Sequence, residues 1–306
     1  MSLTDFPTLS LALGSGAARG LAHIGVLNTL NKAGVKIRAI SGCSIGAVIG
    51  GFYAAGKLPE AEEYYRNMDR GDVIRNFDPV FPAGGLINGK KMIQMFRDIV
   101  GDIRLGETEI PFYPVATELP TGEMEVLQDC RLWEAIRASI SIPGLFKPYR
   151  LKNKWYVDGG LTNPVPVDVL KPYGKESKIV AVSLNLPPAA YRRNWIKPLE
   201  ADDKAFLDRF PAMKSFLKKR GIKLQKKQEK PGMLYTLNRT FHIFQYEIAW
   251  RSIELNQPDY VISPELPGML FYDFHKAEQA ISEGARVAED FLNEWRKKNP
   301  DHSAQK

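Results

Sequence analysis

The chain has 306 residues, of which 44% are hydrophobic and 25% are charged, a composition that fits a globular protein with a sizeable core and excludes a disordered or collagen-like chain. Two cysteines are too few for a disulfide framework or a structural metal site. The start of the chain has no basic and apolar signal segment, and no run of 18 apolar residues predicts a membrane-spanning helix. We therefore expect a cytoplasmic protein that needs no metal or other cofactor.

The net charge of +7 is concentrated in one segment. Residues 204–231 hold ten Lys or Arg against Asp208 and Glu229, so this segment carries +8 and the remainder about −1. Such a local excess argues against a general nucleic-acid-binding surface, and no nucleic-acid partner is expected. Apolar residues recur at helical spacing over 206–217, which predicts a peripheral contact with anionic lipid on the inner face of the membrane. Pro211 interrupts the pattern, so a solvated insertion is the alternative.

The first third of the chain alternates between strand and helix patterns. Residues 8–13 and 35–40 are short apolar runs that predict strands, and apolar residues recur at helical spacing over 21–30 and 45–53. This strand-helix-strand-helix order favours a parallel sheet with crossover helices.

The rest of the chain extends the same α/β pattern without an internal repeat. Pro and Gly make 141–166 irregular, apart from a short apolar strand that ends at Asp158. Helices are predicted at 59–68, 88–100, 131–139, 232–255 and 275–297, and strands at 112–118, 123–128, 178–184 and 260–262. We expect an α/β fold with a mainly parallel central sheet and helices on both faces. The predicted domain organisation is a single domain over 1–306, with a motif-bearing core at 8–190, a basic insertion at 204–231 and a C-terminal helical part at 232–297.

Residues 42–46 fit the pattern G-x-S-x-G at the point where a strand ends and a helix begins. In a nucleophile elbow, a serine lies on a strained strand-to-helix turn, and the flanking glycines let neighbouring backbone pass without side-chain clashes. Ser44 is therefore the candidate nucleophile, with Gly42 and Gly46 as the glycines of the elbow. A packed turn without catalysis is the alternative.

A second glycine-rich loop, residues 14–20, occupies the earlier strand-to-helix junction. As a dinucleotide loop its glycine spacing is imperfect, although Arg38 near the end of the second strand would suit an NADP-binding reductase. As an oxyanion loop it would turn the backbone N–H groups of Gly16 and Ala17 toward a carbonyl attacked by Ser44, because adjacent parallel strands bring both loops to one sheet edge. A tight turn without a ligand is the third alternative.

A serine nucleophile needs a base, and the histidines offer no clear candidate. His302 lies near the end of the chain, His23 is placed for packing or capping, and His242 and His275 lack turn residues around them. A carboxylate is the other option. Asp158 ends a short apolar strand before Gly159 and Gly160, and backbone contacts would hold it in that loop.

Four stretches, taken together, resemble the patatin-like phospholipase family and its bacterial branch related to neuropathy target esterase. They are residues 11–27, 42–47, 138–148 and 157–166, and they occur in the order of the family's motifs. The resemblance covers about residues 8–190. It implies a three-layer α/β/α fold and a lipid ester substrate of the phospholipase or lysophospholipase type.

The resemblance also implies a Ser-Asp dyad without histidine, which maps to Ser44 and Asp158. It assigns the oxyanion hole to Gly14, Gly16, Ala17 and Ala18, with Arg19 bracing the loop or meeting substrate phosphate. Many family members have three successive glycines where this chain has Ser15-Gly16-Ala17, and Ala17 tolerates positive φ poorly. A non-catalytic lipid- or protein-binding regulatory member of the same fold is the alternative function, and the oligomeric state is left open.

Overall fold

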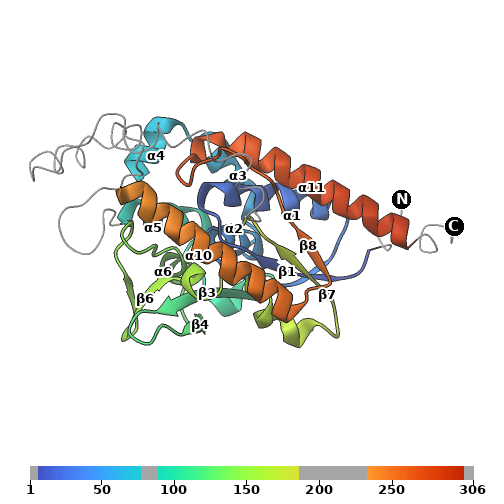
Figure 1. The fold of residues 1–306 in the computed structure, drawn as a ribbon, viewed down its shortest axis with the longest axis horizontal. Helices are drawn as coiled ribbons and strands as arrows, with labels where there is room; N and C mark the ends of the chain where they lie inside the picture. Colours follow the sequence, from blue (N-terminus) through green and yellow to red (C-terminus); the bar gives the residue numbers. More distant parts are fainter. Residues whose placement is uncertain (1–5, 77–88, 186–232, 300–306) are drawn as a thin grey trace, which may run out of the picture.

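The computed structural model describes residues 6–76, 89–185 and 233–299, and its centre is an eight-stranded sheet (Figure 1). The strand order is β5-β6-β3-β2-β1-β7-β8, with β4 also paired to β3. The bounds of the strands are β1 Leu9–Leu13, β2 Ile37–Cys43, β3 Phe112–Glu118, β4 Met124–Val126, β5 Tyr149–Leu151, β6 Lys154–Asp158, β7 Lys178–Val182 and β8 Tyr260–Ile262.

Most of the sheet is parallel, as the sequence predicted. The pairs β2–β3, β1–β2, β1–β7 and β7–β8 are parallel, and the antiparallel pairs β3–β4, β3–β6 and β5–β6 lie at one end. Strand β5 was not predicted. It forms a hairpin with β6 through a turn that has Lys152 at φ 53°, where a glycine or asparagine would have been the usual sequence signal.

The predicted helices are present, and helix α4 is an addition to them. The bounds of the helices are α1 Ala22–Lys32, α2 Ile45–Ala54, α3 Leu58–Arg66, α4 Arg70–Asn76, α5 Lys90–Val100, α6 Leu132–Ser139, α10 Met233–Asn256 and α11 Ala277–Lys298. Short 3-10 turns include η1 (Ala17–Leu21), η3 (Gly159–Leu161) and η4 (Asp168–Tyr173).

The two faces of the sheet are covered unequally. On one face, Leu9, Leu11 and Leu13 of β1 point into the larger apolar core, which includes residues of α1, α2, α6 and α11. On the other face, Ala12 belongs to a smaller apolar cluster that η4 and Ala249 of α10 complete. Figure 1 shows α10 crossing in front of the sheet, so helices cover both faces as expected for a three-layer α/β fold.

Helices α1 and α11 cross so closely that two glycines are required. A Cβ on Gly25 of α1 would lie 1.9 Å from the carbonyl oxygen of Ile281, and a Cβ on Gly284 of α11 would lie 1.9 Å from that of Ala22. Both distances are far below van der Waals contact. The crossing joins the C-terminal helix to the helix that follows the glycine-rich loop.

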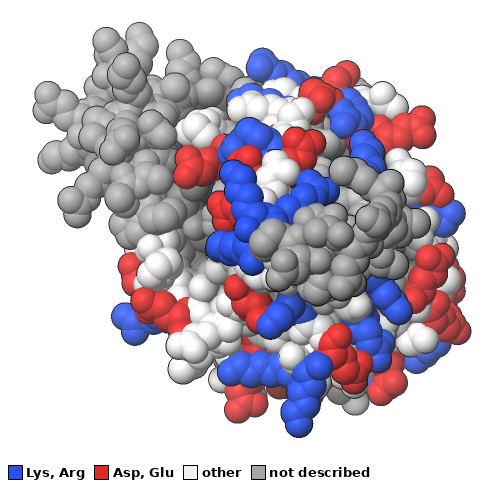
Figure 2. All heavy atoms as spheres, turned by 90° about the vertical axis from the view of Figure 1, so that its right-hand side faces the viewer, with Lys and Arg blue, Asp and Glu red and all other residues white. Residues whose placement is uncertain are grey.

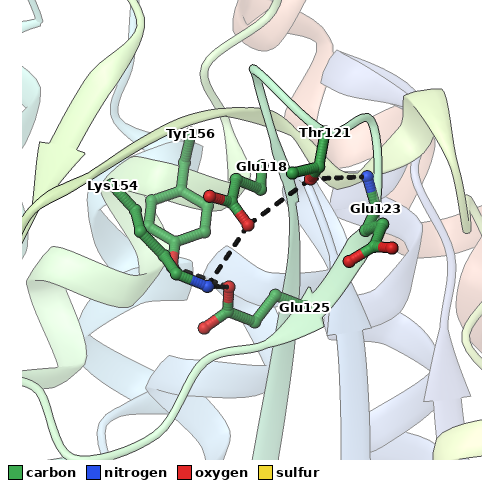
Figure 3. A network of polar contacts seen from close by, with 6 residues as sticks. All are labelled: Glu118, Thr121, Glu123, Glu125, Lys154 and Tyr156. Atoms are coloured by element: carbon green, nitrogen blue, oxygen red, sulfur yellow. Dashed lines mark hydrogen bonds and ion pairs between the residues drawn. The ribbon is translucent and has the colours of Figure 1, made fainter.

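A polar network ties β6 to the β3–β4 hairpin (Figure 3). Lys154 of β6 donates to Glu118 at 3.2 Å and to Glu125 at 2.8 Å, and the Tyr156 hydroxyl donates to Glu125 at 2.9 Å. Because Lys154 is exposed to solvent, its ion pairs stabilise the fold only modestly. The network instead helps to fix the register of the strand that ends at Asp158.

Charges of both signs are mixed on the face shown in Figure 2, which is the side of Figure 1 toward which α11 ends. Ion pairs on that helix, such as Arg286 with Glu283 and Asp290, connect opposite signs. The basic segment 204–231 lies outside the described residues, so its membrane contact remains a prediction, as does the single-domain organisation. None of the helices in the described part of the chain has the length and apolar character needed to cross a membrane.

We predict that Gly284→Ala destabilises the protein by about 1–3 kcal/mol, because the added methyl group forces α11 away from the α1 backbone. Denaturant unfolding at equilibrium measures the change. Gly106→Ala is the matched control, because no atom lies within 4 Å of the position that its Cβ would occupy. Equal unfolding free energies for the two variants would contradict this account of the helix crossing.

Candidate active site

Ser44 lies on the sharp turn between β2 and α2, with φ 56° and ψ −122°. This backbone conformation is rare for a residue with a side chain and is typical of a nucleophile elbow. The flanking glycines are sterically necessary. A Cβ on Gly46 would lie 2.1 Å from the carbonyl oxygen of Leu13, and a Cβ on Gly42 would lie 2.6 Å from that of Gly46. The G-x-S-x-G pattern therefore has the structural setting that the sequence predicted.

Helix α6 stabilises the elbow through a hydrogen bond between its last residue, Ser139, and the backbone of Ser44. The backbone N–H of Ser44 donates to the hydroxyl of Ser139 at 2.9 Å, and that hydroxyl donates to the carbonyl oxygen of Val115 at 2.7 Å. These two consecutive hydrogen bonds connect β2, α6 and β3, and the first of them satisfies the buried amide of the strained Ser44. Sequence reasoning included Ser139 in a matching motif but gave it no role.

Ser44 and Asp158 are in direct contact. The Ser44 hydroxyl donates to Asp158 Oδ2 at 2.6 Å, and both side chains are buried, Asp158 completely. The other carboxylate oxygen, Oδ1, accepts from the backbone N–H of Gly160 at 2.7 Å. Asp158 N–H donates to Ser141 O at 3.0 Å, so the backbone as well as the side chain of this residue is held.

The register of the sheet explains this contact between residues 114 positions apart. Cys43, just before Ser44, is opposite Val115 of β3, and Asp158 is opposite Ala116 on the other edge of β3. Strand β6 runs antiparallel to β3 and ends at this level, so its last residue faces the end of β2 across a single strand. Ser44 and Asp158 were both candidates from the sequence, and the pairing of β2 and β6 with β3 brings them together.

Burial controls the charge of Asp158. Removal from water raises the pKa of this carboxyl from 3.8 to about 7, and the hydrogen bonds from Ser44 and Gly160 oppose the rise. The neighbouring Cys43 thiol has its pKa raised by burial and by Asp158, so it stays neutral. Asp158 is therefore a much stronger base than an exposed aspartate.

The glycine-rich loop lies beside the elbow because β1 and β2 are adjacent parallel strands. Its amides differ in what they contact. Gly14 N–H donates to Val182 O at 2.9 Å, Ser15 N–H to Pro164 O at 2.8 Å, and Ala18 N–H to Phe271 O at 3.1 Å. The amides of Gly16 and Ala17 have no acceptor among the described residues, and Ala17 has φ 50° despite its side chain. The amides of Gly14 and Ala18 are thus already engaged, which removes them from the predicted oxyanion hole, and the assignment of Gly16 and Ala17 to that hole stays a prediction.

Two side chains brace this loop from the protein interior. His23 Nε2 is 2.8 Å from the carbonyl oxygen of Gly14, and burial lowers the pKa of the imidazole to about 4. The ring is therefore neutral and donates from Nε2, a packing role of the kind that the sequence indicated. Arg19 is 3% exposed, and its Nε donates to Gly16 O at 3.4 Å. This contact fits the bracing alternative for Arg19.

The glycines after Asp158 allow its turn to pack tightly. A Cβ on Gly159 would lie 2.5 Å from Val115 O, and a Cβ on Gly160 would lie 2.2 Å from Gln245 Nε2 and 2.9 Å from Asp158 Oδ1. Any larger residue at either position would displace the carboxylate or its neighbours. Gln245 belongs to α10, and sequence reasoning did not connect that helix with the site.

An apolar cavity of about 90 Å³ opens beside Ser44 and Ala17. Its walls come from α2, α3, α4, α5, the loop that follows α6 and the segment that precedes α11. They include Val48, Met68, Met95, Ile142, Phe146 and Phe271. This lining is apolar, so the space beside the serine hydroxyl suits uncharged groups. Phe271 lies outside the stretches that carried the resemblance, and the sequence gave no signal for its place here.

The other histidines considered as a base, His242 and His275, have no hydrogen bond to Ser44 among the described residues. The His275 ring accepts from Arg70 at 3.2 Å on the surface, and His242 is buried in α10. Within 6–76, 89–185 and 233–299, no three His, Cys, Asp or Glu side chains are grouped so that they could hold a metal ion. The absence of a metal requirement remains a prediction.

Residues 11–171 match the family model described as patatin-like phospholipase. An uncharacterized NTE family protein of Mycobacterium tuberculosis is 37% identical over 210 residues, which are 66% of this chain and 58% of that protein. The human patatin-like phospholipase domain-containing protein 6 is 30% identical over 180 residues, which are 56% of this chain and 13% of that protein. The match therefore spans less than two thirds of either relative.

Among solved structures, VipD from Legionella pneumophila is similar with a TM-score of 0.45 at 14% identity, over 95% of this chain and 67% of that chain.

We predict that Asp158→Asn stabilises the folded protein above pH 7. The folded state binds a proton at Asp158 up to about pH 7, whereas the unfolded chain releases it near pH 4, so stability falls as the pH rises through this window. The asparagine removes this cost, which is on the order of a few kcal/mol. Urea unfolding of both proteins at pH 5, 6, 7 and 8 should show a difference that grows up to about pH 7 and then levels off. A difference independent of pH would contradict the assignment of a buried, weakly acidic carboxyl.

Proposed function

The chain belongs to the patatin-like phospholipase family, and on that premise we propose that it is a serine hydrolase of lipid esters with Ser44 as nucleophile and Asp158 as base. The hydrogen bond of 2.6 Å between these two side chains is the observation that carries the proposal. Family membership removes the alternative of an NADP-binding reductase. A non-catalytic member of the family is the remaining alternative.

In the first half of the reaction, Ser44 Oγ attacks the carbonyl carbon of the ester while Asp158 Oδ2 takes the hydroxyl proton. A pKa near 7 suits this task, because a base works best when its pKa is close to the working pH. The negative charge that develops on the carbonyl oxygen is stabilised by the amides of Gly16 and Ala17. Asp158 then gives the proton to the leaving alcohol, and the acyl group remains on Ser44 as an ester.

In the second half, water replaces the alcohol. Asp158 accepts a proton from this water as its oxygen attacks the acyl carbonyl, and the same two amides stabilise the second oxyanion. The proton returns to Ser44 Oγ as the bond to the acyl group breaks, which releases the fatty acid and restores the starting state. One buried carboxylate thus acts as base and acid in both halves.

The cavity supports a lipid acyl chain as the part of the substrate that is recognised. Its walls are apolar, and burial of each methylene stabilises the bound chain by about 0.8 kcal/mol. The peripheral membrane contact through 204–231 is a separate proposal that would bring the cavity to its substrate.

We predict that a fluorophosphonate probe forms one covalent adduct with the wild-type protein and none with Ser44→Ala. Asp158→Asn should label at least a hundred-fold more slowly, since general-base catalysis contributes roughly 10²–10⁴-fold. Intact mass measures the adduct, and hydrolysis of p-nitrophenyl esters and lysophospholipids measures turnover. Absence of an adduct on folded wild-type protein would favour the non-catalytic alternative. Ester hydrolysis retained by Asp158→Asn would reject the aspartate as base.

We also predict that Met95→Trp lowers kcat/KM for p-nitrophenyl laurate about ten-fold more than for the butyrate ester. Met95 lines the cavity, and an indole there excludes about two methylenes of a long chain. Lys91→Trp on the exposed side of the same helix is the control. Equal losses for both esters would show that the acyl chain does not occupy this cavity.

A further inference from the structure

Helix α10 buries a polar side chain at the centre of its inner face. The buried residues His242, Gln245, Tyr246 and Ala249 recur at the spacing of one helix face. Gln245 is only 3% exposed, although a carboxamide is costly to bury without hydrogen-bonding partners. An apolar residue would be the ordinary choice at such a position, so the amide calls for a specific explanation.

The amide of Gln245 lies against the turn that carries Asp158. The point where a Cβ of residue 160 would be is 2.2 Å from Gln245 Nε2 and 2.9 Å from Asp158 Oδ1. The two atoms are therefore no more than about 5 Å apart, a separation that one water molecule can bridge. Gly160 is the residue that makes this approach sterically feasible.

The Asp158 oxygen on this side has unused acceptor capacity. Oδ1 accepts from the Gly160 N–H, and a carboxylate oxygen can accept two hydrogen bonds. The N–H groups of Gln245 carry partial positive charge, which favours the ionised carboxylate in surroundings that contain little water. Cys43 of β2, which interacts with Asp158, is neutral, and His242 is buried one turn before Gln245 on α10.

We propose that Gln245 is a positioning residue that holds the Asp158 carboxylate from its Oδ1 side and favours the charged state that accepts the Ser44 proton. The proposal deepens the function assigned above and rests on it. It gives α10 a part in the chemistry, although the helix lies outside the residues that match the family model. This role toward Asp158 would also explain why a glutamine occupies the buried face of α10.

The test is the pH profile of kcat/KM for a p-nitrophenyl ester in three variants. Gln245→Met keeps the volume and removes the amide, so the apparent pKa of the base should rise by roughly one unit. Gln245→Glu places a second carboxylate beside Asp158 and should raise the apparent pKa further, with activity restored at high pH. The control is Ser252→Ala, which removes a 3.3 Å hydrogen bond from the same helix to Val165 O and should leave the profile unchanged.

A second readout does not depend on turnover. The pH dependence of the stability difference between each Gln245 variant and its Asp158→Asn double mutant reports the pKa of Asp158 by urea unfolding alone. An upward shift in this readout with no activity in any protein would reject the proposed function and support the role of Gln245. Unchanged pKa values in both Gln245→Met and Gln245→Glu would overturn the inference, even if activity falls.

Discussion

The buried Asp158 carboxylate is the constraint on which the site depends. A carboxylate without access to water is unstable as an ion unless its oxygens accept hydrogen bonds, and here Ser44 and Gly160 provide them. Burial outweighs these bonds and raises the pKa to about 7, so the folded protein bears a cost at neutral pH. The same burial gives the aspartate the basicity that the proposed mechanism needs without a histidine. The basicity of Asp158 and the loss of stability at neutral pH thus have one physical origin.

Strained backbone near the serine is held by segments that are distant in sequence. Ser44 and Ala17 both have positive φ, which costs free energy for residues with a side chain. The Ser139 hydroxyl from α6 holds the amide of Ser44, and the carbonyl of Phe271, just before α11, holds the amide that follows Ala17. The α1–α11 crossing fixes that C-terminal segment against the loop. The geometry of the elbow and of the glycine-rich loop therefore depends on packing between segments that are far apart in the sequence.

The local features of the site were predictable because their rules are local. A strand that runs into G-x-S-x-G and then an apolar helical pattern requires a tight turn, and glycines at 42 and 46 are the residues that fit it. Asp158 was identified by its place at a strand end before two glycines, together with a resemblance. Strand β5, helix α4 and the roles of Ser139, Phe271 and Gln245 were not predicted. Their contacts join residues far apart in the chain, and no periodicity or turn signal marks such a partner.

The sequence by itself determined most of the strands and helices and their order, the elbow around Ser44 and the glycine-rich loop, and it marked Asp158 as the candidate acid. Steric rules and side-chain periodicity act over a few residues, so they can be read from the chain directly. Only the tertiary structure decided that the Gly14 and Ala18 amides are engaged, whereas those of Gly16 and Ala17 have no acceptor in the part of the chain that the structure describes. It also decided the basicity of Asp158 and the shape of the apolar cavity. Desolvation and hydrogen-bond competition depend on every atom that surrounds a group, and those atoms come together only when the chain folds.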